Sequence, residues 1–94
     1  MKMLMIIVES SCIEELEVLL RNNGVEGYTE IPKVHGMGET GPRLGSSAYP
    51  KTSSVVFTVV PKEKVDAVLE DIRCYCDRCL KDMKVVVWGV ENVL

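Results

Sequence analysis

The sequence has few of the residues that usually carry catalysis or nucleic-acid binding. It has one histidine, one tryptophan and one phenylalanine in 94 residues, and acidic side chains outnumber basic ones, giving a net charge of −3. Without a basic stripe or interleaved aromatic residues, nucleic-acid binding is not expected. No nucleophile–base pair, acid–base pair or standard cofactor motif is present, so we predict that the chain is not an enzyme.

Long hydrophobic runs are also missing. The N-terminal run, residues 3–8, is far shorter than the roughly 20 residues that span a membrane, and Glu9 follows it. The run is also too short for the apolar part of a signal peptide. We therefore expect a cytoplasmic protein with no direct membrane insertion. In that setting its four cysteines are expected to be thiols or metal ligands rather than disulfides.

The apolar periodicity predicts where the first strand and the first helix lie. Residues 3–8 form a continuous apolar run, which is typical of a strand buried on both faces. Ser11 is followed three positions later by Glu14, which matches the capping box of a helix start. Gly24 is a good stop for that helix.

The rest of the chain supplies three more strands and one more helix. Pro61 is favoured at the first turn of a helix, and that helix keeps one face apolar. The further strands are expected at residues 27–34, 55–60 and 84–90. The order strand, helix, strand, strand, helix, strand predicts an α+β, ferredoxin-like βαββαβ domain over residues 1–94. Its antiparallel four-stranded sheet would carry both helices on one face.

Two helices cover only one face of such a sheet, yet three of the expected strands are apolar on both faces. In residues 55–60, for example, Val55 and Phe57 alternate with Val56 and Val60. An antiparallel sheet with one face in water should instead alternate apolar and polar residues. We therefore expect other copies of the chain to bury the second face, and we predict a homo-oligomer.

The glycine-rich connection over residues 35–53 is the strongest candidate for a functional segment. Most connections in a compact domain contain only about 4–6 residues. Backbone N–H groups around Gly36 and Gly38 could cradle an anion, and the fork of Arg43 suits phosphate or carboxylate. The alternative interpretation is a flexible, turn-rich loop with no ligand.

These features together resemble the PII signal-transduction family. The resemblance covers nearly the whole chain, although each motif alone is weak. It rests on Gly24-Val-Glu-Gly27 before the second strand, Thr29 within it, the His35-Gly36-Met37-Gly38 loop entrance, and residues 55–69.

The resemblance implies how the protein works. Members of that family are homotrimers that bind adenine nucleotides such as ATP or ADP in clefts between subunits. A mobile loop, here about residues 35–53, docks onto a transporter or an enzyme as a target, as in nitrogen regulation. The effector site would then include Thr29, Gly36, Gly38 and Arg43.

The sequence departs from the family pattern at three places. Glu39 and Thr40 stand where the family has basic and amide residues, and the glycine-lysine phosphate loop before the last strand is absent. The basic C-terminal segment of the family is missing as well. All three departures concern features that hold phosphates, so the effector is expected to be small and anionic without being fixed as a particular nucleotide.

A cysteine cluster supports an alternative function, a metal-binding or metal-responsive trimer. Cys74, Cys76 and Cys79 are soft ligands at short spacing that suit zinc or copper(I). On a regular helix Cys74 lies about 200° from Cys76, so a three-thiol site requires the helix to end near Arg73 or a thiol from another subunit. The structural alternative is that these cysteines, and Cys12, are core packing residues.

Overall fold

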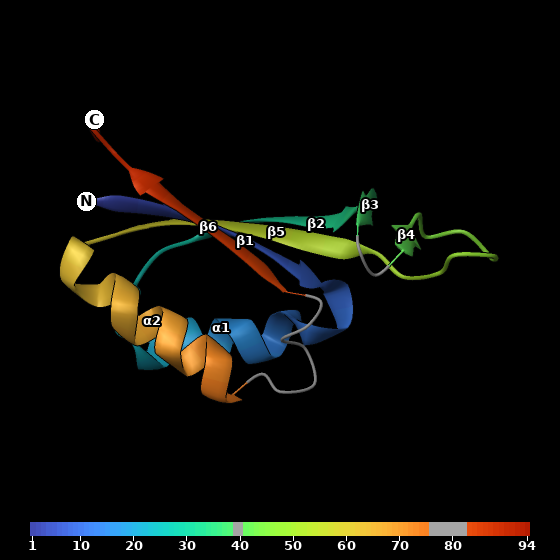
Figure 1. The fold of residues 1–94 in the computed structure, drawn as a ribbon, viewed down its shortest axis with the longest axis horizontal. Coiled ribbons are helices and arrows are strands. Elements are labelled where there is room, and N and C mark those ends of the chain that lie inside the picture. Colours follow the sequence, from blue (N-terminus) through green and yellow to red (C-terminus); the bar gives the residue numbers. More distant parts are fainter. Residues whose placement is uncertain (39–40, 76–82) are drawn as a thin grey trace.

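The computed structural model describes residues 1–38, 41–75 and 83–94, and its main feature is a four-stranded antiparallel sheet (Figure 1). The strand order is β2-β5-β1-β6, with β1 paired to β5 on one side and to β6 on the other. The strands are β1 (Lys2–Glu9), β2 (Thr29–Val34), β5 (Ser53–Val60) and β6 (Lys84–Gly89). Helices α1 (Ile13–Asn22) and α2 (Lys62–Tyr75) lie side by side on one face of this sheet. The ferredoxin-like fold is therefore confirmed.

The start of α1 differs from the prediction. A short 3-10 turn, η1 (Ser10–Cys12), precedes the helix, so that Cys12 occupies the N-cap position. The Ser10 N–H donates to the carbonyl of Thr52 at 3.0 Å, and the Ser11 hydroxyl lies 4.0 Å from the Cys12 sulfur. The capping-box prediction is wrong because Ser11 belongs to this tight turn, and among the described side chains none caps α1.

The end of α1 follows the sequence. Gly24 has a φ of +73°, and the N–H of Val25 donates back to the carbonyl of Leu20 at 3.0 Å. This is the left-handed helix ending that glycine favours. The side chain of Asn23 then donates to the carboxylate of Asp71 at 2.7 Å, which ties the end of α1 to α2.

The core lies between the helices and the sheet. Alternate residues of β1 and β5 are fully buried while their neighbours are half-buried, which is the period of a strand with one face on a core. Burying one such large apolar side chain stabilises the fold by about 1.5–3 kcal/mol. The side chains that fill the core include Leu4, Ile6, Val8, Leu16, Leu20, Val56, Val60, Val68 and Ile72.

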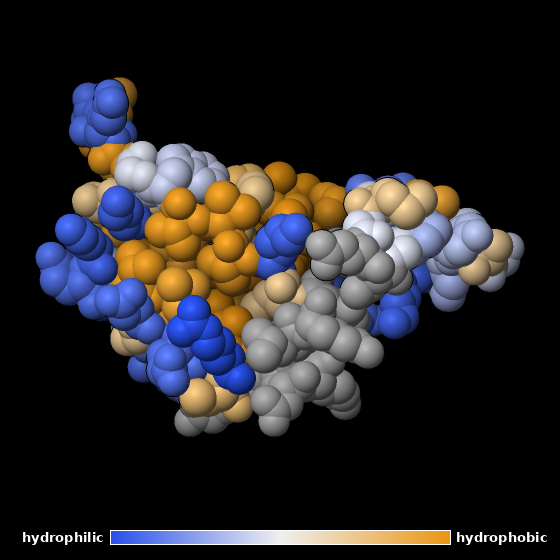
Figure 2. Space-filling view, viewed as in Figure 1, coloured by the Kyte–Doolittle hydropathy of each residue, from blue (hydrophilic) through white to orange (hydrophobic). Residues whose placement is uncertain are grey.

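The second face of the sheet is apolar and lacks a helix. It carries Met5 and Phe57, which are paired across β1 and β5 and are half-buried, and Trp88 and Ile31, which are 43% and 47% exposed. Figure 2 shows a further apolar area over the body of the molecule, with hydrophilic side chains around it. The pattern that suggested an oligomer is thus present in the fold.

The long connection contains structure that the sequence did not indicate. Two three-residue strands, β3 (Gly36–Gly38) and β4 (Gly41–Arg43), pair as a small hairpin and form a second sheet. The connection projects beyond one end of the main sheet (Figure 1). Before it, Lys33 has a φ of 55° and the pairing of β2 shifts register, which gives the edge bulge expected next to Pro32.

Within the parts of the chain that the structure describes, none of the helices has both the length and the apolar character needed to cross a bilayer.

Candidate effector site at the base of the loop

Three of the four predicted effector residues lie together in the hairpin of the connection. Gly36 and Arg43 face each other across β3 and β4, and Gly38 pairs with Gly41. Gly36 and Gly38 are exposed, and no atom lies within 4 Å of where a Cβ would sit on either. Arg43 is half-buried. The hairpin therefore places an arginine beside open backbone that a small anion could approach.

Thr29 lies apart from these three residues within one chain. It begins β2, is exposed, and pairs with Phe57, whereas the connection returns to the sheet at Ser53. Phe57 and Ser53 are four positions apart along β5, a span of about 13 Å. Glu39 and Thr40 are outside the described residues. A site that included Thr29 and Arg43 together would have to extend along the edge of the sheet.

Tyr28, the residue before Thr29, has a raised pKa. The Tyr28 hydroxyl donates to the carboxylate of Glu17 at 2.5 Å. This hydrogen bond, followed by desolvation and the negative charge of Glu17, raises the pKa of Tyr28 above its usual value of 10.0. The tyrosine is therefore neutral at physiological pH and holds the segment that leads into β2 against α1.

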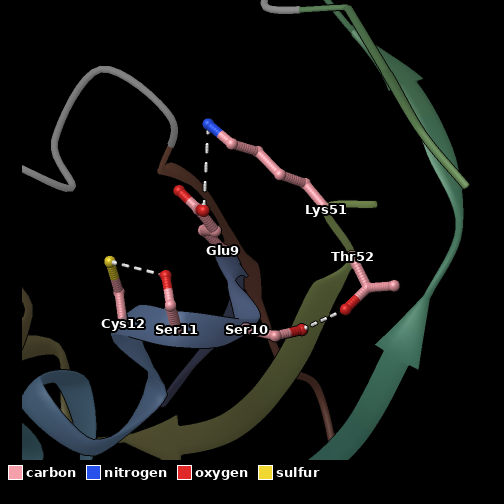
Figure 3. Close-up of polar contacts among 6 residues, drawn as sticks. All are labelled: Glu9, Ser10, Ser11, Cys12, Lys51 and Thr52. Atoms are coloured by element: carbon pink, nitrogen blue, oxygen red, sulfur yellow. Dashed lines mark hydrogen bonds and ion pairs between the residues drawn. The ribbon is translucent and has the colours of Figure 1, made fainter. Parts of the chain in front are cut away.

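The connection is fastened to the main sheet by four residues that we call the loop clasp: Glu9, Ser10, Lys51 and Thr52 (Figure 3). The hydroxyls of Ser10 and Thr52 lie 2.8 Å apart, beside the 3.0 Å backbone bond between the same two residues. The Lys51 ammonium lies 3.9 Å from the Glu9 carboxylate. That pair is partly exposed and contributes little by itself, so the two Ser10–Thr52 contacts are the main fastening.

Sequence reasoning missed this clasp. Ser10 and Thr52 are 42 positions apart in the sequence, so no local pattern joins them. The only sequence signal is that polar residues end β1 and precede β5. In an antiparallel pair these two ends lie at the same edge.

Gly45 is the tightest point of the connection. Its φ is +64°, and a Cβ there would lie 3.0 Å from the Thr52 methyl carbon and 3.3 Å from Nε2 of His35. The Gly45 N–H also donates to the carbonyl of Lys51 at 3.3 Å, which closes the segment above the clasp. A glycine is therefore required here by both backbone conformation and space.

We expect Gly45→Ala to lower the free energy of unfolding by about 1–2 kcal/mol, because alanine at positive φ is strained and its methyl group meets Thr52. Urea unfolding measures the change. Gly27→Ala is the matched control, since Gly27 has ordinary φ and no atom within 4 Å of its Cβ position. Equal effects of the two variants would contradict this description of the loop base.

The cysteines differ from the prediction in one respect. Cys12 is in a disulfide, whose other sulfur lies outside the described residues. The expectation of thiols is wrong for this residue because disulfide pairing depends on distance in space rather than on spacing in sequence. Cys74 is a free, exposed thiol near the end of α2, while Cys76 and Cys79 are outside the described residues.

The metal site stays a prediction. Among the residues that the structure describes, no group of three or more His, Cys, Asp or Glu side chains could hold a metal ion. Two of the three cysteines proposed as ligands for zinc or copper(I), Cys76 and Cys79, lie beyond that part. The residues of the hairpin and the clasp are therefore the better-defined candidate site.

A search of known families gives a match over the whole chain. The model described as "Nitrogen regulatory protein P-II" matches residues 1–94. The chain belongs to the nitrogen regulatory protein P-II family. This confirms the resemblance noted in the sequence. None of the curated protein sequences matches the chain significantly.

Several solved structures resemble the P-II fold of this chain. The nitrogen regulatory PII-like protein CPII from Thiomonas intermedia K12, bound to ADP, AMP and bicarbonate, is 27% identical, with a TM-score of 0.80 over 95% of this chain and 84% of that one. CPII bound to ADP and bicarbonate gives 28% identity at the same TM-score and the same coverage. A PII-like signaling protein from Thermus thermophilus is 21% identical, with a TM-score of 0.72 over 95% and 85% of the two chains, and shares the fold.

Proposed function

We propose that this P-II family protein is a cytoplasmic homotrimeric regulator that binds an adenine nucleotide between subunits. Binding would change how the 35–53 loop engages a transporter or an enzyme. The role is regulatory rather than catalytic. The observation that carries the proposal is the likeness to CPII, which was solved with ADP, AMP and bicarbonate and matches nearly the whole chain.

The uncovered sheet face supports the trimer. Met5, Phe57 and Trp88 form an apolar surface that a second copy would remove from water. Three copies packed through this face would also bring the edge strand of one subunit near the loop of another. That arrangement gives Thr29 a place in the same cleft as Arg43, although the two are separate within one chain.

The hairpin supports an anionic effector. Gly36 and Gly38 are exposed and leave the hairpin backbone uncovered by side chains, and Arg43 supplies a guanidinium that can make bidentate bonds to a phosphate or to bicarbonate. The glycine-lysine loop that other members use is missing here, so we assign the phosphate contact to Arg43. ADP with bicarbonate is the effector pair that the CPII structures favour.

Isothermal titration of ADP, with and without bicarbonate, tests this function directly. We expect Arg43→Ala to weaken ADP binding about 10- to 100-fold, the loss of one charge-assisted contact. Arg73→Ala is the control, because Arg73 is exposed on α2 and its Glu70 partner is 3.5 Å away on the same helix. No heat of binding for ADP, AMP or ATP with the wild-type trimer would overturn the nucleotide proposal.

A further inference from the structure

A disulfide bond of Cys12 lies next to the loop clasp in the sequence. Cys12 is 4% exposed and is held in a disulfide. It ends the same three-residue turn, η1, that Ser10 begins, and Ser10 makes two hydrogen bonds to Thr52 (Figure 3). The turn is therefore fixed at its start by the clasp and at its end by a disulfide.

The turn depends on these two fastenings. A 3-10 segment of three residues has few hydrogen bonds of its own. Neither η1 nor α1 has a side-chain cap in the described part of the chain. Loss of the covalent bond would therefore leave the end of η1 without its covalent anchor, next to a clasp whose strongest contacts are two hydrogen bonds at 2.8 and 3.0 Å.

The chain also contains a free thiol. Cys74 is exposed, and its only described contact is a hydrogen bond to a Glu70 carboxylate oxygen at 3.8 Å. A chain with both a disulfide and a free cysteine can undergo thiol–disulfide exchange. Disulfides in reducing compartments are mostly transient and redox-sensing, and the proposed cytoplasmic location puts the Cys12 bond in that class.

We propose that the Cys12 disulfide is a redox-responsive tether that stabilises the loop clasp when oxidised and loosens it when reduced. A thiolate of a dithiol reductant attacks the sulfur bonded to Cys12, because Cys12 itself is buried. The S–S bond breaks, and the Cys12 sulfur leaves with the electron pair and takes a proton. The second reductant thiol then displaces the other protein cysteine. Two protein thiols and one oxidised dithiol result.

The first test is a thiol count on air-oxidised protein in denaturant, followed by peptide mapping. We expect two reactive thiols of the four cysteines, with Cys12 linked to Cys76 or Cys79. Four reactive thiols, or a link that omits Cys12, would overturn the proposal. These measurements use the protein without nucleotide, so their outcome is separate from that of the ADP titration.

The second test compares oxidised and reduced wild-type protein. Reduction with a dithiol should lower Tm by at least about 8 °C, as expected for loss of a disulfide in a domain of this size. Amide hydrogen exchange in residues 45–52 should become at least about tenfold faster, because those amides then open locally. Equal Tm values in the two redox states, or unchanged exchange in the loop, would contradict the tether.

Two variants separate the Cys12 bond from other effects of the reductant. Cys12→Ala keeps the buried site apolar and should show no further change on reduction. Cys74→Ser removes the free thiol and should respond as the wild type does. A Cys12→Ala protein that still loses the same Tm on reduction would refute the proposal, and the wild-type comparison decides the matter if that variant does not fold.

Discussion

Phe57→Glu should convert the proposed trimer into monomers. Phe57 lies in β5 on the face that no helix covers, opposite Met5 on β1 and Thr29 on β2. A glutamate at this point would carry an unpaired charge into the centre of an apolar contact. Removing such a charge from water costs several kcal/mol. We therefore expect the dissociation constant of the proposed trimer to rise by about a thousandfold or more.

Sedimentation analysis over a range of concentrations measures this effect. Val18→Glu is the matched control, since it places the same charge on a 50% exposed residue of α1, away from the uncovered face. We expect that variant to assemble as the wild type does. A wild-type protein that is already monomeric, or a Phe57→Glu protein that stays trimeric, would show that the chain does not assemble through this face.

The main sheet and the helices could be predicted because their signals are local. The alternation of Val55, Val56, Phe57 and Val60, and the continuous run in residues 3–8, depend only on which neighbours are apolar. The structure extends these strands by one or two residues at their ends. Element ends are set by weaker forces, such as the bond from Ser10 to Thr52, and these are invisible in a short window.

The candidate site could be predicted in part. Glycine spacing and one arginine pointed to Gly36, Gly38 and Arg43, and pairing of β3 with β4 does bring them together. The clasp and the Cys12 disulfide could not be predicted, because each joins residues far apart in the sequence. The capping-box pattern at Ser11 misled for the same reason. The long-range contact between Ser10 and Thr52 holds Ser11 in the η1 turn, so the Ser11 hydroxyl does not cap α1.

The two faces of β1 should respond differently to the loss of a side chain. Leu4 is fully buried against the helices, and Leu4→Ala should cost about 2–5 kcal/mol, for the lost burial and the cavity left behind. That is a large share of the roughly 5–15 kcal/mol that stabilises a domain. Urea unfolding gives the value. A loss under about 1 kcal/mol would mean that the core closes around the gap.

Met5→Ala is the informative partner of that variant. Met5 is the next residue of the same strand and is half-buried on the uncovered face. If the trimer covers it, its loss weakens association, so the destabilisation relative to the wild type is largest where the wild type is assembled and shrinks as dilution makes both proteins monomeric. The loss from Leu4→Ala acts within each subunit and should add the same increment at every concentration. Identical concentration dependence in the two variants would mean that assembly does not use this face, and the proposed cleft between subunits would then lose its physical basis.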